Sequence, residues 1–148
     1  MNIIGANFGI HFLDDAICDP SNHYGTNYCT PIFHQMTNHQ VTQSLNQIGG
    51  PISPAPLTAL TSDPVAIVYG DADAYSNGGH YSAGTCQPVV LAAAYGQGRV
   101  LALGHEGYLS TDDYDDNGVV NLHDYGNPQF GLDVIHWLAK RSPNSPYR

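Results

Sequence analysis

The chain has 148 residues and a mass of 15.9 kDa, which is the size of one domain. Four side chains are Lys or Arg and 13 are Asp or Glu, so the formal net charge is −9. This charge argues against nucleic acid and anionic membranes as partners, because proteins bind both through Lys and Arg. No apolar run reaches about 18 residues, which predicts no membrane insertion. We expect a single domain over residues 1–148.

Composition and cysteines favour an extracellular or cell-surface location. Ten Tyr and a single Lys predict a surface that is polar without being charged, although no signal peptide is recognised in this chain. Cys18 and Cys29 lie in one loop-like stretch, where a disulfide would close a small ring and contribute about 3 kcal/mol. Cys86 would then be free or paired with another chain. The alternative is three buried free thiols in an intracellular protein.

The first half of the chain predicts few regular elements. We expect the end of a helix over residues 1–8, a short strand over residues 10–13 and a loop over residues 19–31. Residues 39–48 predict a helix, because three apolar side chains recur at helical spacing after a candidate N-cap at Asn38.

The second half is more regular. Apolar runs predict a strand over residues 65–69 and a β-hairpin of residues 88–95 and 99–104, joined by Gly96-Gln97-Gly98. A helix with Pro in its first turn is expected over residues 128–140. Continuous apolar runs are typical of strands covered on both faces. The pattern therefore predicts an α/β fold, a Rossmann or flavodoxin-like sheet flanked by helices.

The most specific local motif is an acidic loop before the last helix. Asp113, Asp115 and Asn117 occupy alternate positions and a glycine follows them, which is the pattern of a twelve-residue calcium loop. In that loop, oxygens from alternate residues converge on one cation. The predicted Ca²⁺ ligands are Asp113, Asp115, Asn117, the Val119 carbonyl, Asn121 and Asp124.

An Asp at the twelfth position resembles the calcium loops of dockerin modules. The motif would be an insertion over residues 112–125, and we expect its cation to have a structural role. Extracellular calcium sites bind with dissociation constants of roughly 10⁻⁴–10⁻³ M, and we expect an affinity in that range. A solvated acidic loop is the alternative.

Four further segments resemble the class I glutamine amidotransferase-like family, whose domains are flavodoxin-like. They are Asn7–Phe12, Asn38–Ile48, the stretch AYGQGRVLALGHEGY over residues 94–108, and the stretch from Phe130 to Ala139. The resemblance implies either the C-terminal portion of such a domain or a domain completed by another chain, because no βαβ unit precedes these segments. It does not extend to catalysis. The family's nucleophile is a Cys at a sharp turn between a strand and a helix, and Cys86 is not in such a turn. Its partners are a His and a Glu separated by one residue, whereas His105 and Glu106 are adjacent in the sequence.

Polar side chains that follow predicted strands form a candidate ligand site, since ligands of open α/β sheets bind beyond strand ends. We expect a carbohydrate or a neighbouring protein chain to bind there. The candidate residues are Asp71, Asp73, Tyr75, His105 and Glu106.

The leading hypothesis is a non-catalytic, calcium-stabilised extracellular domain with a structural, binding or assembly role. A hydrolase acting on carbohydrate or peptide, with His105, Glu106 and Asp71 at the strand ends, is one alternative. A self-assembling homo-oligomeric subunit is another.

Overall fold

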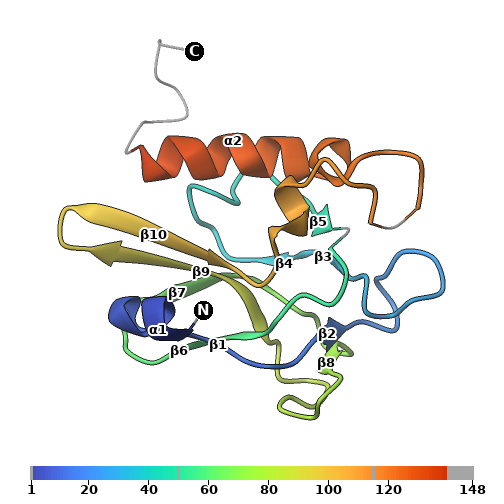
Figure 1. Cartoon of the computed structure of the whole chain (residues 1–148), viewed down its shortest axis with the longest axis horizontal. Helices are drawn as coiled ribbons and strands as arrows, with labels where there is room; N and C mark the ends of the chain where they lie inside the picture. Colours follow the sequence, from blue (N-terminus) through green and yellow to red (C-terminus); the bar gives the residue numbers. More distant parts are fainter. Residues whose placement is uncertain (1, 50, 115, 140–148) are drawn as a thin grey trace.

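A computed structural model of the chain describes residues 2–49, 51–114 and 116–139. Its centre is a four-stranded sheet with the strand order β10-β9-β7-β4 (Figure 1). The strands are β4 (Gln35–Met36), β7 (Val65–Tyr69), β9 (Pro88–Tyr95) and β10 (Gly98–Leu103). Every pair in this sheet is antiparallel, and the β9–β10 hairpin turns between Tyr95 and Gly98. The hairpin lies where the sequence predicts it.

Three two-stranded sheets surround this centre, and each pairs strands distant in sequence. They are β1 (Ile10–Phe12) with β6 (Leu57–Ala59), β2 (Ile17–Cys18) with β8 (Tyr75–Ser76), and β3 (Ile32–Phe33) with β5 (Ile48–Gly49). All three pairs are antiparallel. A short α1 (Asn2–Gly5) and a 3₁₀ turn η1 (Ala6–Phe8) precede β1.

The last helix, α2 (Asn127–Leu138), lies across one face of the central sheet (Figure 1). Pro128 stands in its first turn, where a missing N–H costs no hydrogen bond. Two 3₁₀ turns, η2 (Glu106–Leu109) and η3 (Asn121–His123), connect β10 to α2. None of the helices in the described ranges is long and apolar enough to cross a membrane.

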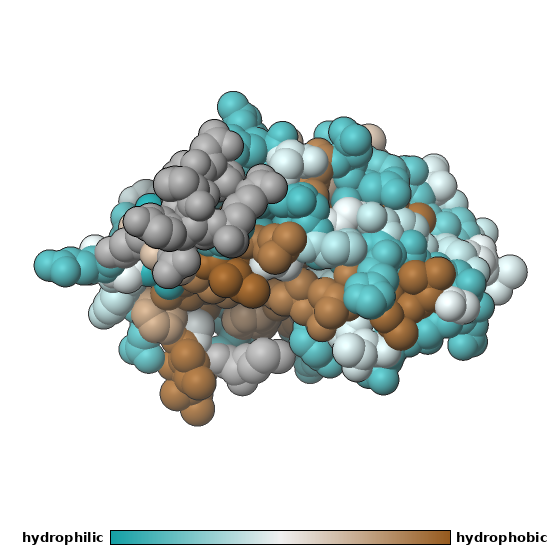
Figure 2. Space-filling view, turned by 90° about the horizontal axis from the view of Figure 1, so that it is seen from above, coloured by the Kyte–Doolittle hydropathy of each residue, from teal (hydrophilic) through white to brown (hydrophobic). Residues whose placement is uncertain are grey.

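The sequence predicts one apolar stripe on this helix, but α2 is apolar on more than its buried side. Phe130, Val134 and Trp137 are buried against the sheet, whereas Ile135 and Leu138 are exposed. Seen from above, the α2 face of the molecule carries a band of hydrophobic atoms (Figure 2).

The buried side chains form two clusters on opposite faces of the central sheet. The larger one lies between the sheet and α2 and includes Ile67, Val90 and Trp137. The smaller one joins Leu91 and Ala102 to the β1–β6 pair. The sheet is thus covered by a helix on one face and by a second small sheet on the other.

The predicted Rossmann or flavodoxin-like α/β fold is therefore wrong. The described strand pairs are all antiparallel, and the fold is β-rich. Continuous apolar runs predict strands that are covered on both faces. A β-pair covers the second face equally well, so such runs do not distinguish the two folds.

The predicted helix over residues 39–48 is also wrong, because only one helical turn forms there. The Thr42 hydroxyl donates to the carbonyls of Thr37 (2.6 Å) and His39 (3.3 Å), and the Thr42 N–H also bonds to His39 (2.9 Å). Such local hydrogen bonds compete with helix formation. The chain leaves the turn and enters β5.

Candidate functional site

Hydrogen bonds connect the first, fifth and last residues of the predicted calcium loop. The Asp113 carboxylate accepts the N–H groups of Asn117 (3.1 Å) and Gly118 (2.8 Å), which folds the loop back on its start. The Asn117 side-chain amide donates to the carboxylate of Asp124. The Asn117 carbonyl oxygen accepts the N–H of Val119 at 2.7 Å. These hydrogen bonds link three predicted ligands, Asp113, Asn117 and Asp124, within one loop.

The other predicted ligands are arranged differently. Asn121 is buried, and its side-chain oxygen accepts the N–H of Tyr114 at 3.1 Å, so this side chain joins the two ends of the loop. Asp115 lies outside the described residues. Gly118 has a φ of 86°, a left-handed conformation that glycine adopts without strain.

The same loop holds the beginning of α2. The Asn127 N–H donates to the carbonyl of Asp124 (3.0 Å), and its buried side chain donates to the carbonyls of Gly49 and Asn121, both at 2.8 Å. The Asn127 side chain also accepts the Gly49 N–H at 3.2 Å. A conformational change in the loop would therefore disturb the hydrogen bonds that hold the first residue of α2 and the end of β5.

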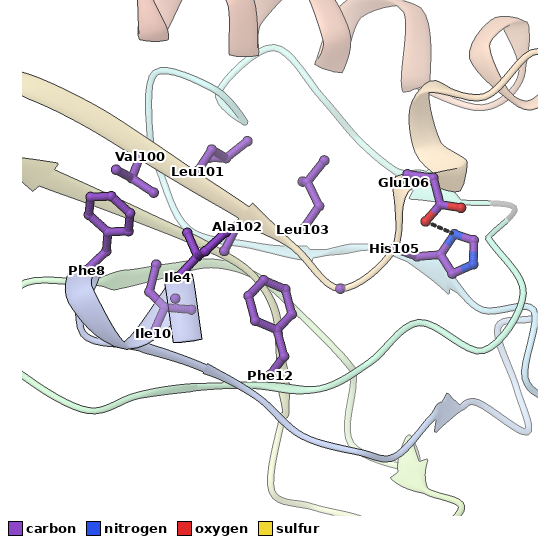
Figure 3. A pocket seen from close by; sticks show the side chains of 12 residues that line it. Ile4, Phe8, Ile10, Phe12, Val100, Leu101, Ala102, Leu103, His105 and Glu106 are labelled. Atoms are coloured by element: carbon purple, nitrogen blue, oxygen red, sulfur yellow. Dashed lines mark ion pairs between the residues drawn. The ribbon is translucent and has the colours of Figure 1, made fainter. Parts of the chain in front are cut away.

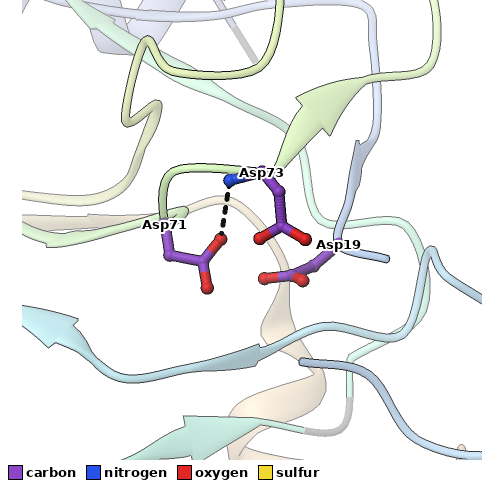
Figure 4. Close-up of side chains that lie close together, drawn as sticks. All are labelled: Asp19, Asp71 and Asp73. Carbon is purple, nitrogen blue, oxygen red and sulfur yellow. Dashed lines mark hydrogen bonds between the residues drawn. The ribbon is translucent and has the colours of Figure 1, made fainter. Parts of the chain in front are cut away.

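A second group of carboxylates consists of Asp19, Asp71 and Asp73, which each offer an oxygen within 4.8 Å of the others (Figure 4). Donors from Ser21 and Asn22 hold this group. Asp19 accepts the N–H groups of Ser21 (2.9 Å) and Asn22 (2.7 Å). The Asn22 side chain donates to Asp71 at 2.5 Å, and the Ser21 hydroxyl donates to Asp73.

The surroundings shift the pKa values of Asp19 and Asp73 in opposite directions. Burial raises the pKa of Asp19, and the negative charges of Asp71 and Asp73 raise it further. The hydrogen bond from Ser21 lowers the pKa of Asp73. Asp19 was not predicted as a site residue, although it directly follows Cys18 at the end of β2. That strand pairs with Tyr75, which brings Asp19 to the loop after β7.

The predicted ligand site at the strand ends thus falls into separate groups. Asp71 and Asp73 lie with Asp19, and Tyr75 pairs with Cys18 in the β2–β8 ladder. His105 and Glu106 line a different feature, a cavity beside β10.

This cavity has a volume of about 440 Å³ and opens between β10 and the N-terminal segment (Figure 3). Ile4, Phe8, Ile10 and Phe12 form its lower wall. Residues 100–106 form the other wall, with His105 and Glu106 at one end (Figure 3). Its lining comes from segments about 90 residues apart in the chain, so no local pattern could have predicted it.

His105 and Glu106 approach each other at the end of the cavity, with 3.6 Å between Nδ1 and Oε2. The same Nδ1 accepts the Gly107 N–H at 2.8 Å. A nitrogen that accepts a hydrogen bond has no proton to share with a carboxylate. In this arrangement the His105 Nδ1 accepts from Gly107 and does not donate a hydrogen bond to Glu106.

Another histidine–carboxylate pair, His80 with Asp15, has the hydrogen bond of a catalytic dyad at 2.8 Å. Burial acts to raise the pKa of Asp15, but hydrogen bonds outweigh it and hold the pKa well below its usual range. The donors are Ser76, Gly78, His80 and Ala16. Within the described ranges, no Ser, Thr or Cys side chain hydrogen-bonds the His80 ring. The pair ties the 76–80 loop to the segment before β2.

Cys18 and Cys29 form a disulfide bond. It closes the loop that contains Asp19, Ser21 and Asn22, the residues that build one side of the carboxylate group. Cys86 is a free, exposed thiol.

No family model matches the chain, and no curated protein matches its sequence. Among solved structures, the fold is similar to that of a chain described as "mmIFT52 N-terminal domain", an intraflagellar transport protein, with a TM-score of 0.66 and 15% sequence identity. The match covers 93% of this chain and 56% of that chain, so this chain spans little more than half of its neighbour's length. At this identity the likeness shows the fold alone.

This neighbour corrects the predicted family. Its fold is β-rich, so the resemblance to class I glutamine amidotransferase-like domains is wrong, as is the flavodoxin-like assignment made from it. Two of the four segments fall on the β9–β10 hairpin and α2, and a strand hairpin followed by an amphipathic helix occurs in unrelated folds. The other two fall on η1 with β1 and on the turn before β5.

Proposed function

We propose that this chain is a non-catalytic domain that binds a protein partner. The apolar cavity beside β10 is the observation that carries this proposal. Its volume of about 440 Å³ is in the range of ligand-binding clefts, and among the described residues only His105 and Glu106 contribute ionisable side chains to its lining. Such a lining suits the apolar side chains of another protein.

The lining favours binding over hydrolysis. It contains no Ser, Thr or Cys from the described part of the chain, and the His105 Nδ1 is already engaged by Gly107. The hydrolase hypothesis also requires Asp71 beside His105 and Glu106. In the described residues Asp71 instead belongs to the Asp19 group and not to this lining. The carbohydrate and homo-oligomer hypotheses remain predictions from the sequence.

An extracellular or cell-surface location is part of the proposal. The Cys18–Cys29 disulfide supports it, because disulfides persist in oxidising compartments and are rare in the cytosol. The fold neighbour is an intraflagellar transport protein and points instead to an intracellular complex, but its identity to this chain is only 15%. The partner proposal itself is independent of the compartment.

Calcium binding by the loop over residues 113–124 is a second proposed role. The approach of Asp113, Asn117 and Asp124 supports it. Carboxylate and amide oxygens are ligands that Ca²⁺ prefers. Bound there, the ion would offset the repulsion between the acidic side chains and order the loop that holds Asn127 and the start of α2.

The binding proposal is tested with two matched variants of α1. Ile4 lines the cavity and is 69% exposed, whereas Ile3 is 90% exposed and does not line it. Peptide ligands are selected from a random phage library on the full chain, and their affinities are measured by calorimetry. We expect Ile4→Ser to weaken them at least about tenfold, since an apolar contact of about 1.4 kcal/mol is lost. Ile3→Ser should change them less than about twofold.

Selected ligands that bind both variants as tightly as the unmodified chain would contradict the proposal. A selection that yields no ligand would contradict it as well. Unfolding curves of the two variants, compared before the titrations, show whether any loss of affinity comes from unfolding.

The calcium proposal is tested by thermal melting in EGTA and in millimolar Ca²⁺. We expect Ca²⁺ at about ten times its dissociation constant to stabilise the chain by roughly 1.4 kcal/mol, and Asp124→Asn to abolish most of this gain. Asp63→Asn, an exposed acid in another loop, is the control and should keep it. Equal melting of the unmodified chain with and without Ca²⁺ would contradict the calcium role and leave the binding proposal intact.

A further inference from the structure

Building on the proposed binding function, we propose that the partner occupies the cavity as an extended strand. This strand would add to the free edge of β10, antiparallel to it, with apolar side chains at alternate positions. A Lys or Arg near its N-terminal end would face Glu106.

The backbone of β10 presents a free edge. In the described part of the chain β10 pairs only with β9, at one end of the sheet order. The Gly104 N–H donates to the carbonyl of Val89 at 2.9 Å, so this N–H points across the hairpin toward β9. In an antiparallel ladder hydrogen-bonded pairs alternate with non-hydrogen-bonded ones, and Arg99, Leu101 and Leu103 must direct their N–H and C=O groups away from β9.

These outward groups are available. Among the described residues, no backbone or side-chain group hydrogen-bonds to the main chain of Arg99, Leu101 or Leu103. An unpaired strand edge is a template for another chain, and proteins commonly use such edges to recognise extended peptides.

The cavity follows this edge. Side chains alternate between the two faces of a strand, so a cavity over one face would contact every second residue. Here seven consecutive residues, 100–106, line it. Leu101 and Leu103 pack toward the α2 cluster, whereas Val100 and Ala102 belong to the cluster on the other face. A cavity that reaches both sets lies beside the strand, where the next strand of the sheet would run.

A segment around Ala55 marks the point where β10 ends. The Ala55 N–H donates to the carbonyl of Gly104 at 2.9 Å. On its other side this segment accepts N–H groups, Pro54 from Ile17 (2.8 Å) and Pro56 from Leu13 (3.0 Å). This segment therefore contacts Gly104 just after β10 ends, and among the described residues no strand pairs with the outer edge of residues 99–103.

The walls determine which side chains the added strand needs. Ile4, Phe8, Ile10 and Phe12 lie below β10 and offer an apolar surface to one face of the incoming strand (Figure 3). Every second side chain of the partner should therefore be apolar.

Charge determines the end group of the strand. The Glu106 side chain is 81% exposed and lies where β10 ends. All 13 acidic residues precede residue 140, whereas Arg99 is the only Lys or Arg there. A cationic partner is favoured by this field, and a second copy with its own charge of −9 is disfavoured. In an antiparallel strand the N-terminal end lies beside Glu106.

The test uses a blocked peptide of about seven residues, an arginine followed by alternating valine and threonine, titrated into the full chain. Its reversed sequence carries the arginine at the other end. We expect the arginine-first peptide to bind about threefold tighter, the size of an exposed ion pair, and Glu106→Gln to remove this preference. No preference for either sequence, or one that survives in Glu106→Gln, would overturn the assigned orientation.

Backbone pairing is tested by N-methylation of alternate residues. Alternate N–H groups of a strand point to the same side, so one set of methyl groups blocks the β10 edge and the other set points away. One set should weaken binding at least about tenfold, and the other should change it less than about threefold. Equal effects of the two sets, or no binding of the parent peptide, would overturn strand addition.

The two proposals fail in different ways. The same N-methyl pairs are made from the library ligands that depend on Ile4. Ligands that lose affinity in Ile4→Ser but tolerate both sets of methyl groups would keep the binding function and overturn the strand. Ligands insensitive to Ile4→Ser would overturn the binding function itself.

Discussion

Arg99 joins the free edge of the sheet to the end of the last helix through Trp137. Its Nη1 donates to the carbonyl of Trp137, and its guanidinium lies 5.2 Å from the centre of the indole ring. The carbonyls at a helix C-terminus have no partners within the helix and carry partial negative charge. Arg99 of β10 therefore lies at the C-terminal end of α2, where a positive charge interacts favourably with the helix dipole.

Replacing this residue should loosen the contact between β10 and α2. Arg99→Met keeps an unbranched apolar stem but removes the hydrogen bond and the cation–π contact, and we expect a loss of about 1–2 kcal/mol in the free energy of unfolding. Urea unfolding followed by tryptophan fluorescence measures it. Gln97→Met, an exposed change in the adjacent turn, is the control. Equal midpoints for the two variants would show that the contact does not stabilise the fold.

The Arg99 charge also acts on a histidine. His39 packs against the Trp137 ring, with 5.2 Å between ring centres. Burial lowers the pKa of His39 below its ordinary value of 6.5, and the charge of Arg99 lowers it further. The neutral ring is thus favoured in the folded chain. The stability that this ring contributes is present above the unfolded pKa and is lost as the pH falls through the folded pKa.

A nuclear magnetic resonance titration of the His39 ring checks this effect. We expect its midpoint below 6.5 in the unmodified chain and closer to that value in Arg99→Met. The His39→Gln variant identifies the resonance. In this variant the free energy of unfolding should decrease less between about pH 7 and pH 5 than in the unmodified chain. A midpoint at or above 6.5 would contradict the proposed burial of the neutral ring.

Local patterns were sufficient for part of this fold. Residues 88–104 contain two apolar runs around a Gly-x-Gly turn, and they form the β9–β10 hairpin. Pro128 and the spaced apolar residues after it mark α2. In both places the sequence interval that carries the signal is also the interval that makes the hydrogen bonds.

The direction and covering of the strands could not be predicted in the same way. Val65–Tyr69 is equally apolar in a parallel or an antiparallel sheet, and its neighbours β4 and β9 come from distant parts of the chain. The second cover of the sheet is the β1–β6 pair, whose strands have three residues each. The strand over residues 10–13 is predicted and forms as β1, but no local pattern indicates that it pairs with β6.

The candidate sites also differ in whether a local pattern predicts them. Asp113, Asn117 and Asp124 lie within twelve residues, and their spacing alone suggested that they converge. Asp19 meets Asp71 only because β2 pairs with β8, and the wall of the cavity beside β10 needs contacts between residues 4–12 and 100–106. Such long-range proximity follows from the packing of the whole chain and not from any local motif.

The Cys18–Cys29 disulfide should stabilise the chain by restricting the unfolded state. It spans a sequence separation of 11 residues, for which the chain-entropy model gives about 3 kcal/mol. We compare Cys29→Ser with the unmodified chain, both in a Cys86→Ser background so that the exposed thiol cannot exchange. Urea unfolding should show a loss of about 2–4 kcal/mol, and reductant should bring the disulfide-bonded chain to the same stability. Unfolding curves that coincide with and without reductant would mean that the hydrogen bonds of Asp19 with Ser21 and Asn22 hold this loop without the disulfide.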